Sequence, residues 1–252
     1  MAKLLWDQTG ERLYETGDRN VALYVYNSTA LEKTMSGEGA SALTTTTNYY
    51  NPVAWNGITA MTETPSGAEP TDLWADDTKY ATMRSAEQFG GTIEAYTYPD
   101  EWEQCDGSVT VNGVTLGQQG RKAFGLAYIT TVGNDTELND FGQKIHLVYN
   151  ATANPSERSY ATVNDSPEAI TFSWEYTTTP IDCKVGATEY KKVACLTLDY
   201  RKLCMTKSVT GSGWTVDSQK LAKWNAFKEI LFGSDDADGY LPMPADVIAF
   251  FA

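Results

Sequence analysis

Alternating apolar and polar positions dominate the middle of the chain and predict β-strands. The clearest case is residues 169–176, where two faces separate: Ile170, Phe172, Trp174 and Tyr176 on one, Thr171, Ser173 and Glu175 on the other. Comparable runs, rich in β-branched and aromatic residues, occur at residues 92–98, 123–129, 144–149 and 192–198. Such residues suit a pleated, half-buried surface, so we expect strands whose apolar faces form the core.

Turn-forming residues separate these runs. Asn112 and Gly113 accept the two positive φ angles of a tight hairpin, and residues 64–70 have the composition of a loop. Residues 31–51 are rich in Ser, Gly and Thr. That segment is too polar to hold a core of its own, so it is predicted to be either a loop or an extended arm.

One helix is well defined by its pattern. Asp217 suits the N-cap, Gly233 suits the stop, and apolar residues recur between them at helical spacing: Leu221, Trp224, Phe227 and Leu231. A shorter helix is predicted over residues 85–89. The fold class is therefore mainly β: two packed β-sheets, as a sandwich or barrel, with one flanking α-helix near the C-terminus. We expect a single domain over residues 1–252, with the loop or arm at 31–51 and the helix plus tail at 217–252.

Charge changes the picture of possible partners. The 252 residues carry 33 acidic and 19 basic side chains, a net charge of −14, which argues against a protein that grips phosphates. No apolar run approaches the roughly 20 residues of a membrane span, and the start lacks the apolar stretch of a secretory signal. Without an export signal, free thiols are expected for the cysteines, none of which forms a C-x-x-C pair: Cys105, Cys183, Cys195 and Cys204.

Catalytic and metal motifs are missing from the sequence. The one histidine, His146, falls on the outward face of a strand and is predicted to be a polar surface or interface residue. No nucleophile elbow, P-loop or dinucleotide fingerprint occurs. Residues 234–239 resemble half an EF-hand but lack the bidentate Glu, and the prolines at 242 and 244 argue against an exit helix. We expect a solvated acidic loop there, and no catalytic, cofactor or metal site.

Carboxylates beside aromatic residues indicate a second possible class of function. Asp100, Glu101 and Glu103 flank Trp102, and the chain has seven tryptophans that could line a sugar groove. A β-sandwich carbohydrate-binding module is therefore the alternative function, and a glycosidase a weaker one. Neighbouring acids arise by chance in a chain with 33 of them, so an enzyme is not expected.

Several segments, in order along the chain, resemble the major tail proteins of long-tailed, siphovirus-type bacteriophages. They are residues 5–12, 53–57, 66–70, 93–101, 122–126, 133–136, 144–149, 164–170, 231–233, 241–244 and 247–250. The resemblance is weakest at residues 24–50 and 182–216. It implies a non-enzymatic structural virion protein whose hexameric rings stack into the tail tube, with two packed β-sheets and a helix on the flank.

The same resemblance implies partners and a location. The partners are copies of the chain itself, the tape measure protein, the tail terminator and tail-tip or initiator proteins, with double-stranded DNA passing through the lumen without specific binding. The location is the virion tail, assembled in the host bacterial cytoplasm, with no cofactor and no membrane. The negative net charge of the chain suits a conduit for DNA, because a negatively charged wall repels phosphates.

Two groups of residues are predicted to serve such a tube. Glu94 and Glu175 should point away from the core, because a lone buried carboxylate is costly, and are candidates for the lumen wall. Candidates for contact with an adjacent ring come from the predicted arm: Thr44, Thr45, Thr46, Thr47, Tyr49 and Tyr50.

Overall fold

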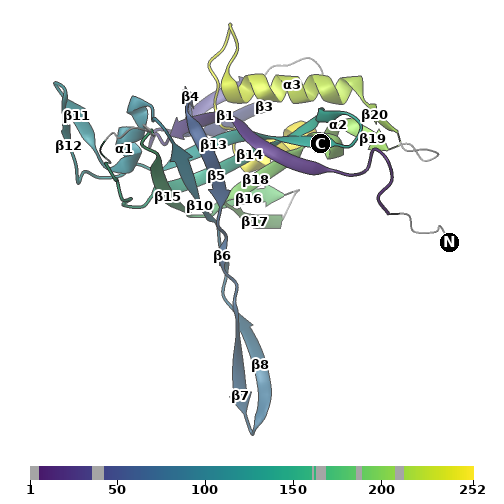
Figure 1. The fold of residues 1–252 in the computed structure, drawn as a ribbon, viewed down its shortest axis with the longest axis horizontal. Helices are drawn as coiled ribbons and strands as arrows, with labels where there is room; N and C mark the ends of the chain where they lie inside the picture. Colours follow the sequence, from purple (N-terminus) through teal and green to yellow (C-terminus); the bar gives the residue numbers. More distant parts are fainter. Residues whose placement is uncertain (1–5, 36–42, 161, 163–168, 186–188, 208–212) are drawn as a thin grey trace.

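The chain folds around an eight-stranded antiparallel sheet (Figure 1). The computed structural model describes residues 6–35, 43–160, 162, 169–185, 189–207 and 213–252. In spatial order the sheet contains β4 (Val53–Ala54), β1 (Tyr14–Val25), β13 (Phe124–Asn134), β14 (Leu138–Ala153), β15 (Phe172–Thr178), β10 (Gly90–Ala95) and β5 (Ile58–Glu63). β18 (Cys195–Asp199) also pairs with β14, beside residues 144–148.

Six two-stranded ladders and the helices complete the described fold. The ladders are β2 (Leu31–Met35) with β3 (Leu43–Thr47), β6 (Ser66–Gly67) with β9 (Glu87–Gln88), β7 (Pro70–Ala75) with β8 (Thr78–Arg84), β11 (Val109–Val111) with β12 (Val114–Leu116), β16 (Ile181–Val185) with β17 (Glu189–Val193), and β19 (Met205–Lys207) with β20 (Trp214–Val216). The helices are a 3-10 turn (Asp100–Trp102), α1 (Glu103–Asp106), α2 (Tyr200–Cys204), α3 (Ser218–Phe232) and α4 (Pro244–Phe251).

The central strands of the large sheet, β1, β13 and β14, contribute to a core on each face. β13 divides its side chains between them, with Ala127 and Ile129 on one face and Phe124 and Leu126 on the other. The first face packs against α3 and α4 through a group that we call the helix-side core: Ile145, Leu147, Tyr149, Trp224, Phe227, Leu231, Val247 and Phe250. Burial of this apolar stripe is what holds the helices on the sheet.

The second face encloses an aromatic cluster, the tryptophan core, formed by Trp55, Trp102 and Trp174. Their ring centroids lie 4.6 Å apart for Trp55–Trp102 and 5.6 Å apart for Trp102–Trp174. Residues of β1, β10, β13 and β15 all belong to this cluster, so the two ends of the sheet pack against each other across it. The prediction of a mainly β fold with packed antiparallel sheets and a C-terminal helix is thereby confirmed.

Local sequence signals explain the strands and helices that were predicted correctly. In β15, Trp174 and Tyr176 are buried whereas Ser173 and Glu175 are exposed, as alternation required. The Asp217 carboxylate accepts hydrogen bonds from the backbone N–H groups of Gln219 and Lys220, which caps α3. The helix ends at Gly233, whose φ of 85° suits glycine.

Other expectations were wrong. Ile170 lies outside β15 and is exposed, because the strand begins at Phe172. Residues 192–198 do not form one strand but end β17 and supply β18. Residues 85–89 form no helix; β9 occupies Glu87–Gln88 and pairs with β6, which in turn belongs to the segment expected to be a loop.

A second C-terminal helix was also missed. α4 begins at Pro244, in the first helical turn, where proline lacks only an N–H that would have no helical partner. The prolines around Met243 therefore start a helix rather than exclude one.

Candidate assembly surfaces

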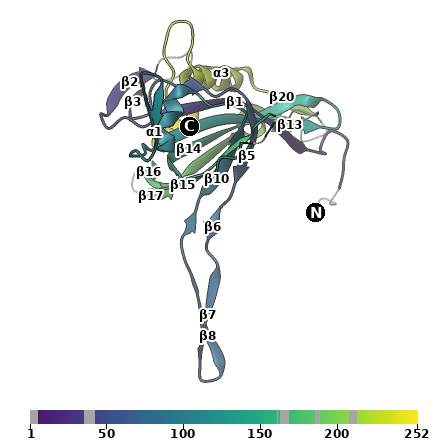
Figure 2. The ribbon, with the colours of Figure 1, turned by 60° about the vertical axis from the view of Figure 1, so that its left-hand side comes forward.

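A long hairpin projects from the body of the molecule (Figures 1 and 2). It leaves the sheet at the end of β5, passes through the β6–β9 ladder to the β7–β8 ladder, and returns to the sheet at the start of β10. Asp76 and Asp77 form its two-residue turn, with φ angles of 50° and 59°. Two consecutive positive φ angles are typical of a type I′ hairpin turn, so this segment is built as an extended arm.

The outer part of the hairpin carries large apolar side chains without a packing partner. Trp74 is 69% exposed and Tyr80 is 77% exposed, and Leu73 and Met83 are exposed beside them. Figures 1 and 2 show no other element alongside this part of the hairpin. Contiguous exposed apolar residues of this kind mark interaction surfaces.

Polar contacts across the two strands order the outer hairpin. The Asp72 carboxylate lies 2.7 Å from Lys79 Nζ and accepts a hydrogen bond of 2.9 Å from the Thr82 hydroxyl. An isolated two-stranded ladder is marginally stable in water, so these cross-strand pairs help to keep the arm extended.

A polar cluster ties the root of the hairpin to the sheet. Glu63, the last residue of β5, accepts a hydrogen bond of 2.5 Å from the Tyr128 hydroxyl and lies 3.3 Å from His146 Nδ1. The His146 ring stacks on Tyr128, with centroids 4.7 Å apart and planes 3° apart. His146 Nε2 is also 3.0 Å from the Thr130 hydroxyl.

This root cluster corrects one expectation and shifts two pKa values. His146 was expected on the outward face of its strand as a surface or interface residue, but only 13% of its side chain is exposed. The hydrogen bond from His146 is the main cause that lowers the pKa of Glu63. Burial, followed by the Glu63 hydrogen bond, raises the pKa of Tyr128 far above its ordinary value. Ionised Glu63 therefore fixes the end of β5 against β13 and β14.

The two lumen-wall candidates lie on one polar face of neighbouring strands. In the β10–β15 ladder, Glu94 pairs with Ser173 and Thr92 pairs with Glu175, opposite to the buried residues of the same strands. Glu175 is exposed and Glu94 is half-buried. The structure thus brings both carboxylates to the same side of the sheet, away from the tryptophan core.

The predicted arm at residues 31–51 divides into two parts. Thr44, Thr45 and Thr46 belong to the β2–β3 ladder, where they pair with Thr34, Lys33 and Glu32, whereas residues 36–42 lie outside the described residues.

The second part of that segment enters the helix-side core. The Thr47 hydroxyl donates to the Leu241 carbonyl at 2.8 Å, and buried Tyr49 packs edge-on against Tyr26 and Tyr149. Tyr50 stacks on Tyr240 with ring centroids 5.3 Å apart. Thr47 and Tyr49 are therefore buried in this chain, and neither side chain lies on its surface as the predicted arm required.

A second exposed hairpin, β11–β12, was correctly predicted from Asn112 and Gly113, whose φ angles are 53° and 79°. Its register pairs Val109 with Leu116 and Val111 with Val114, and all of these side chains are exposed. On the opposite face, the Thr110 hydroxyl donates to Glu103. Residues 108–120 contain no charged side chain, so this hairpin presents an uncharged apolar face.

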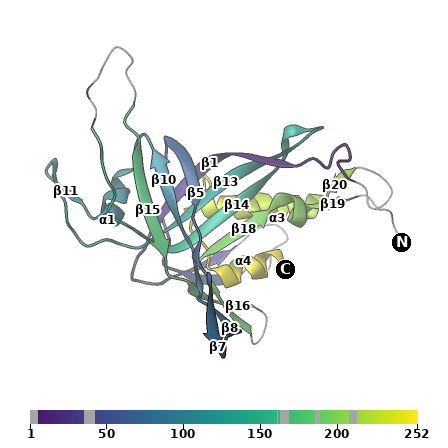
Figure 3. The ribbon, with the colours of Figure 1, turned by 60° about the horizontal axis from the view of Figure 1, so that its bottom comes forward.

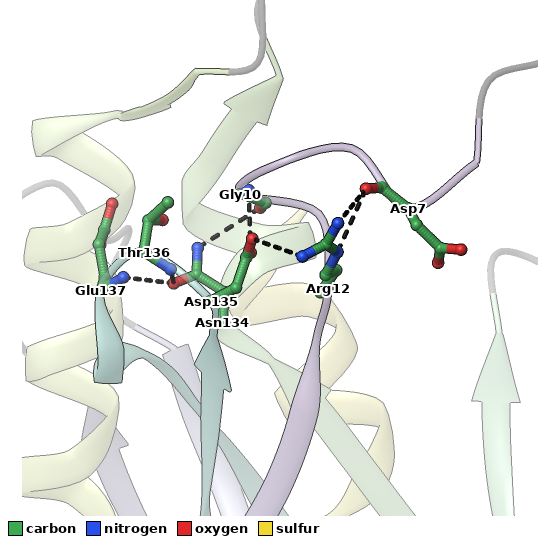
Figure 4. A network of polar contacts seen from close by, with 7 residues as sticks. All are labelled: Asp7, Gly10, Arg12, Asn134, Asp135, Thr136 and Glu137. Carbon is green, nitrogen blue, oxygen red and sulfur yellow. Dashed lines mark hydrogen bonds and ion pairs between the residues drawn. The ribbon is translucent and has the colours of Figure 1, made fainter.

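The N-terminal segment is fastened to the tip of the β13–β14 hairpin (Figure 4). Asn134 Oδ1 accepts from the backbone N–H groups of Thr136 and Glu137, and Asp135 Oδ1 accepts from the Gly10 N–H at 2.9 Å. The Arg12 guanidinium donates to the Asp7 carbonyl and lies 3.9 Å from Asp135. Two segments that carry the phage-tail resemblance, residues 5–12 and 133–136, are therefore in contact.

Three of the tryptophans that could have lined a sugar groove are buried instead. Trp102, between the carboxylates at 101 and 103, is fully buried in the tryptophan core, as are Trp55 and Trp174. Within the described ranges, no three His, Cys, Asp or Glu side chains gather as metal ligands would. All four cysteines are free, and Cys195 is the exposed one.

Comparison with known proteins adds no relative. No protein-family model and no curated protein matches this chain. Among the described residues, none of the helices has the length and apolar character needed to cross a membrane.

Proposed function

We propose that this chain is a structural subunit that assembles with copies of itself into hexameric rings, stacked as the tail tube of a long-tailed bacteriophage. The observation that carries the proposal is the projecting hairpin, whose Trp74 and Tyr80 side chains are largely exposed to solvent. Apolar side chains held this far from the body are expected to be covered by another molecule.

The geometry of the arm favours an open assembly. A projecting arm and the surface that receives it are different parts of the molecule, so the contact is heterologous, and repeated heterologous contacts build rings or filaments. The β11–β12 hairpin supplies a second, uncharged apolar face. Copies that each carry a net charge of −14 repel one another, and contacts at uncharged faces keep that repulsion low.

The polar face with Glu94 and Glu175 suits the wall of a DNA conduit. Carboxylates do not bind phosphates, and a wall of Lys or Arg would hold the duplex through counterion release. The hexameric order, the tape measure, terminator and initiator partners, and the location in the virion tail rest on the resemblance in sequence.

A concentration series of the full chain tests the proposal. Sedimentation velocity should show monomers when dilute, then rings and longer assemblies as concentration rises. Replacing residues 68–86 by Asn-Gly, which closes the Gly67–Glu87 pair with a two-residue turn, should preserve folding by circular dichroism and abolish long assemblies.

A matched pair of variants distinguishes specific contacts of the arm from non-specific hydrophobic association. Trp74→Ala with Tyr80→Ala should prevent long assemblies, whereas Trp6→Ala with Tyr160→Ala, which removes similarly exposed rings elsewhere, should not. A chain that stays monomeric at every concentration, including with a tail initiator present, would contradict the proposal.

A further inference from the structure

An apolar groove on the body of the molecule is lined by residues of β18 and α4, and Figure 3 shows where these two elements lie. Its volume is about 510 Å³, within the range of pockets that accept a small ligand or a few side chains. Its larger apolar lining residues are Leu196, Leu198, Leu203, Val247, Ile248 and Phe251. In the described strands β18 pairs only with β14, so the edge of β18 away from β14 has no strand partner.

Lysines lie at the edge of this groove and in a hollow beside it. Lys144 and Lys202 line it, and Lys202, Leu203 and Phe251 also line an adjoining hollow that contains Lys220 and Lys223. Lys144 pairs with Glu15, and Lys223 Nζ is 3.4 Å from the Phe250 carbonyl. Within the described residues, Lys202 and Lys220 form no ion pair.

The acidic residues of the two hollows already have local roles. Asp199 caps α2 and lies 3.6 Å from Arg201, and Asp217 caps α3. The groove is therefore apolar with cationic edges, in a chain whose net charge is −14. Such a surface selects an apolar segment that carries acids.

The outer end of the β7–β8 hairpin has this chemistry. Exposed Leu73 and Trp74 are followed by Asp76 and Asp77 in the turn. We infer that the β7–β8 tip of a second copy docks in the groove between β18 and α4, with Trp74 against the apolar lining and the two aspartates near Lys202 and Lys220. This inference rests on the proposed self-assembly and names the surface that receives the arm.

The contact must be between molecules, because the hairpin extends away from its own body (Figures 1 and 2). Each copy then offers one tip and one groove. Since these are different surfaces, the contact propagates from copy to copy. The fit also explains why large apolar groups are tolerated on the tip, which is covered after assembly.

Site-specific photo-crosslinking of the assembled full chain tests the location. With p-benzoylphenylalanine in place of Trp74, irradiation should link the tip to residues 196–203 or 247–252 of another copy, identified by mass spectrometry after proteolysis. Crosslinks confined to other regions of an assembled sample would overturn the groove while leaving self-assembly intact. Failure to assemble at all, in wild type as well, would instead count against the proposed function.

Neutralising the charges tests the chemistry. Lys202→Gln with Lys220→Gln should raise the concentration for half-assembly about tenfold, and Asp76→Asn with Asp77→Asn should do the same. Asparagine is chosen because it tolerates positive φ. Combining all four changes should raise the concentration for half-assembly little further than either pair alone, because both pairs remove the same contact.

The control removes two cations elsewhere. Arg19→Gln with Lys228→Gln alters a hollow beside α3 and changes the net charge equally, so assembly should be unaffected. Equal weakening by the control, or additive effects of the groove and tip pairs, would show a general charge effect and would overturn the docking.

Discussion

The body and the projecting hairpin use the same residue types in opposite environments. In the body, Trp55, Trp102 and Trp174 are buried and contact one another. On the hairpin, Trp74 and Tyr80 are exposed to solvent, and order comes from cross-strand polar pairs such as Asp72 with Lys79. Aromatic content alone therefore does not distinguish a folding core from a binding surface. What decides is whether a second layer of structure covers the strand.

The largest expected difference between the two regions is in stability. Trp174→Ala empties the centre of the tryptophan core and should lower the free energy of unfolding by about 3–5 kcal/mol. Trp74→Ala removes an exposed ring and should change it by less than about 0.5 kcal/mol, while impairing assembly. Denaturant titration of dilute monomer measures both. Comparable losses would mean that the hairpin tip packs on its own body.

The second largest difference in stability is expected between the two parts of the 31–51 segment. Thr47→Val removes a buried hydroxyl that donates to the Leu241 carbonyl, leaving that carbonyl unsatisfied, and should cost about 1–2 kcal/mol. Thr46→Val, at the adjacent exposed position of β3, should be close to neutral. Thermal or chemical unfolding compares them directly, and a neutral Thr47 variant would show that this segment is not anchored as described.

The root of the hairpin should respond to acid. Hydrogen bonding to His146 lowers the pKa of Glu63 below its ordinary value of 4.5. A lowered pKa stabilises the fold above the unfolded value, and that stabilisation is lost as pH falls through the folded pKa. Glu63→Gln should therefore be destabilising at about pH 5.5 and much less so at about pH 3.

His146→Gln should remove most of that dependence on pH, and hydrogen exchange of the β5 and β10 amides would locate the loosening at the root. If Glu63→Gln and wild type keep a constant difference across this range, the cluster does not hold the hairpin electrostatically.

Thiol labelling should give the smallest and most local difference. Cys195 is exposed while the other three cysteines are buried, so native protein should react at one site and unfolded protein at all four. Partial desolvation of its sulfur, followed by the nearby charges of Glu63 and Glu87, raises the pKa of Cys195, which keeps its thiolate scarce. Glu63→Gln should speed labelling at about pH 8, because the thiolate is the reacting form. An unchanged rate would place Cys195 outside the influence of the root cluster.

Predictions from the sequence held where one short segment carries its own signal. Alternation in β15 separated Trp174 from Glu175, the Asp217 cap located α3, and Asn112 with Gly113 located the β11–β12 turn. In each case the signal lies within a few consecutive residues, and tertiary contacts do not override it.

The missed features depend on contacts or on ambiguous residues. The β7–β8 hairpin has no buried face, so its alternation was too weak to find, although Asp76 and Asp77 suit a tight turn. The Glu63–His146 contact joins strands far apart in the chain. Tyr49 lies among small polar residues, and only the fold shows that it enters the core.

Electron microscopy of the concentrated full chain, beside the variant in which Asn-Gly replaces residues 68–86, shows whether the chain forms tubes and whether the hairpin is needed for them. We expect six-membered rings stacked into hollow tubes for the wild type, and single subunits or isolated rings for the variant. Tubes of normal length from the variant would contradict the role of the hairpin, and single particles from both proteins would contradict the tube itself.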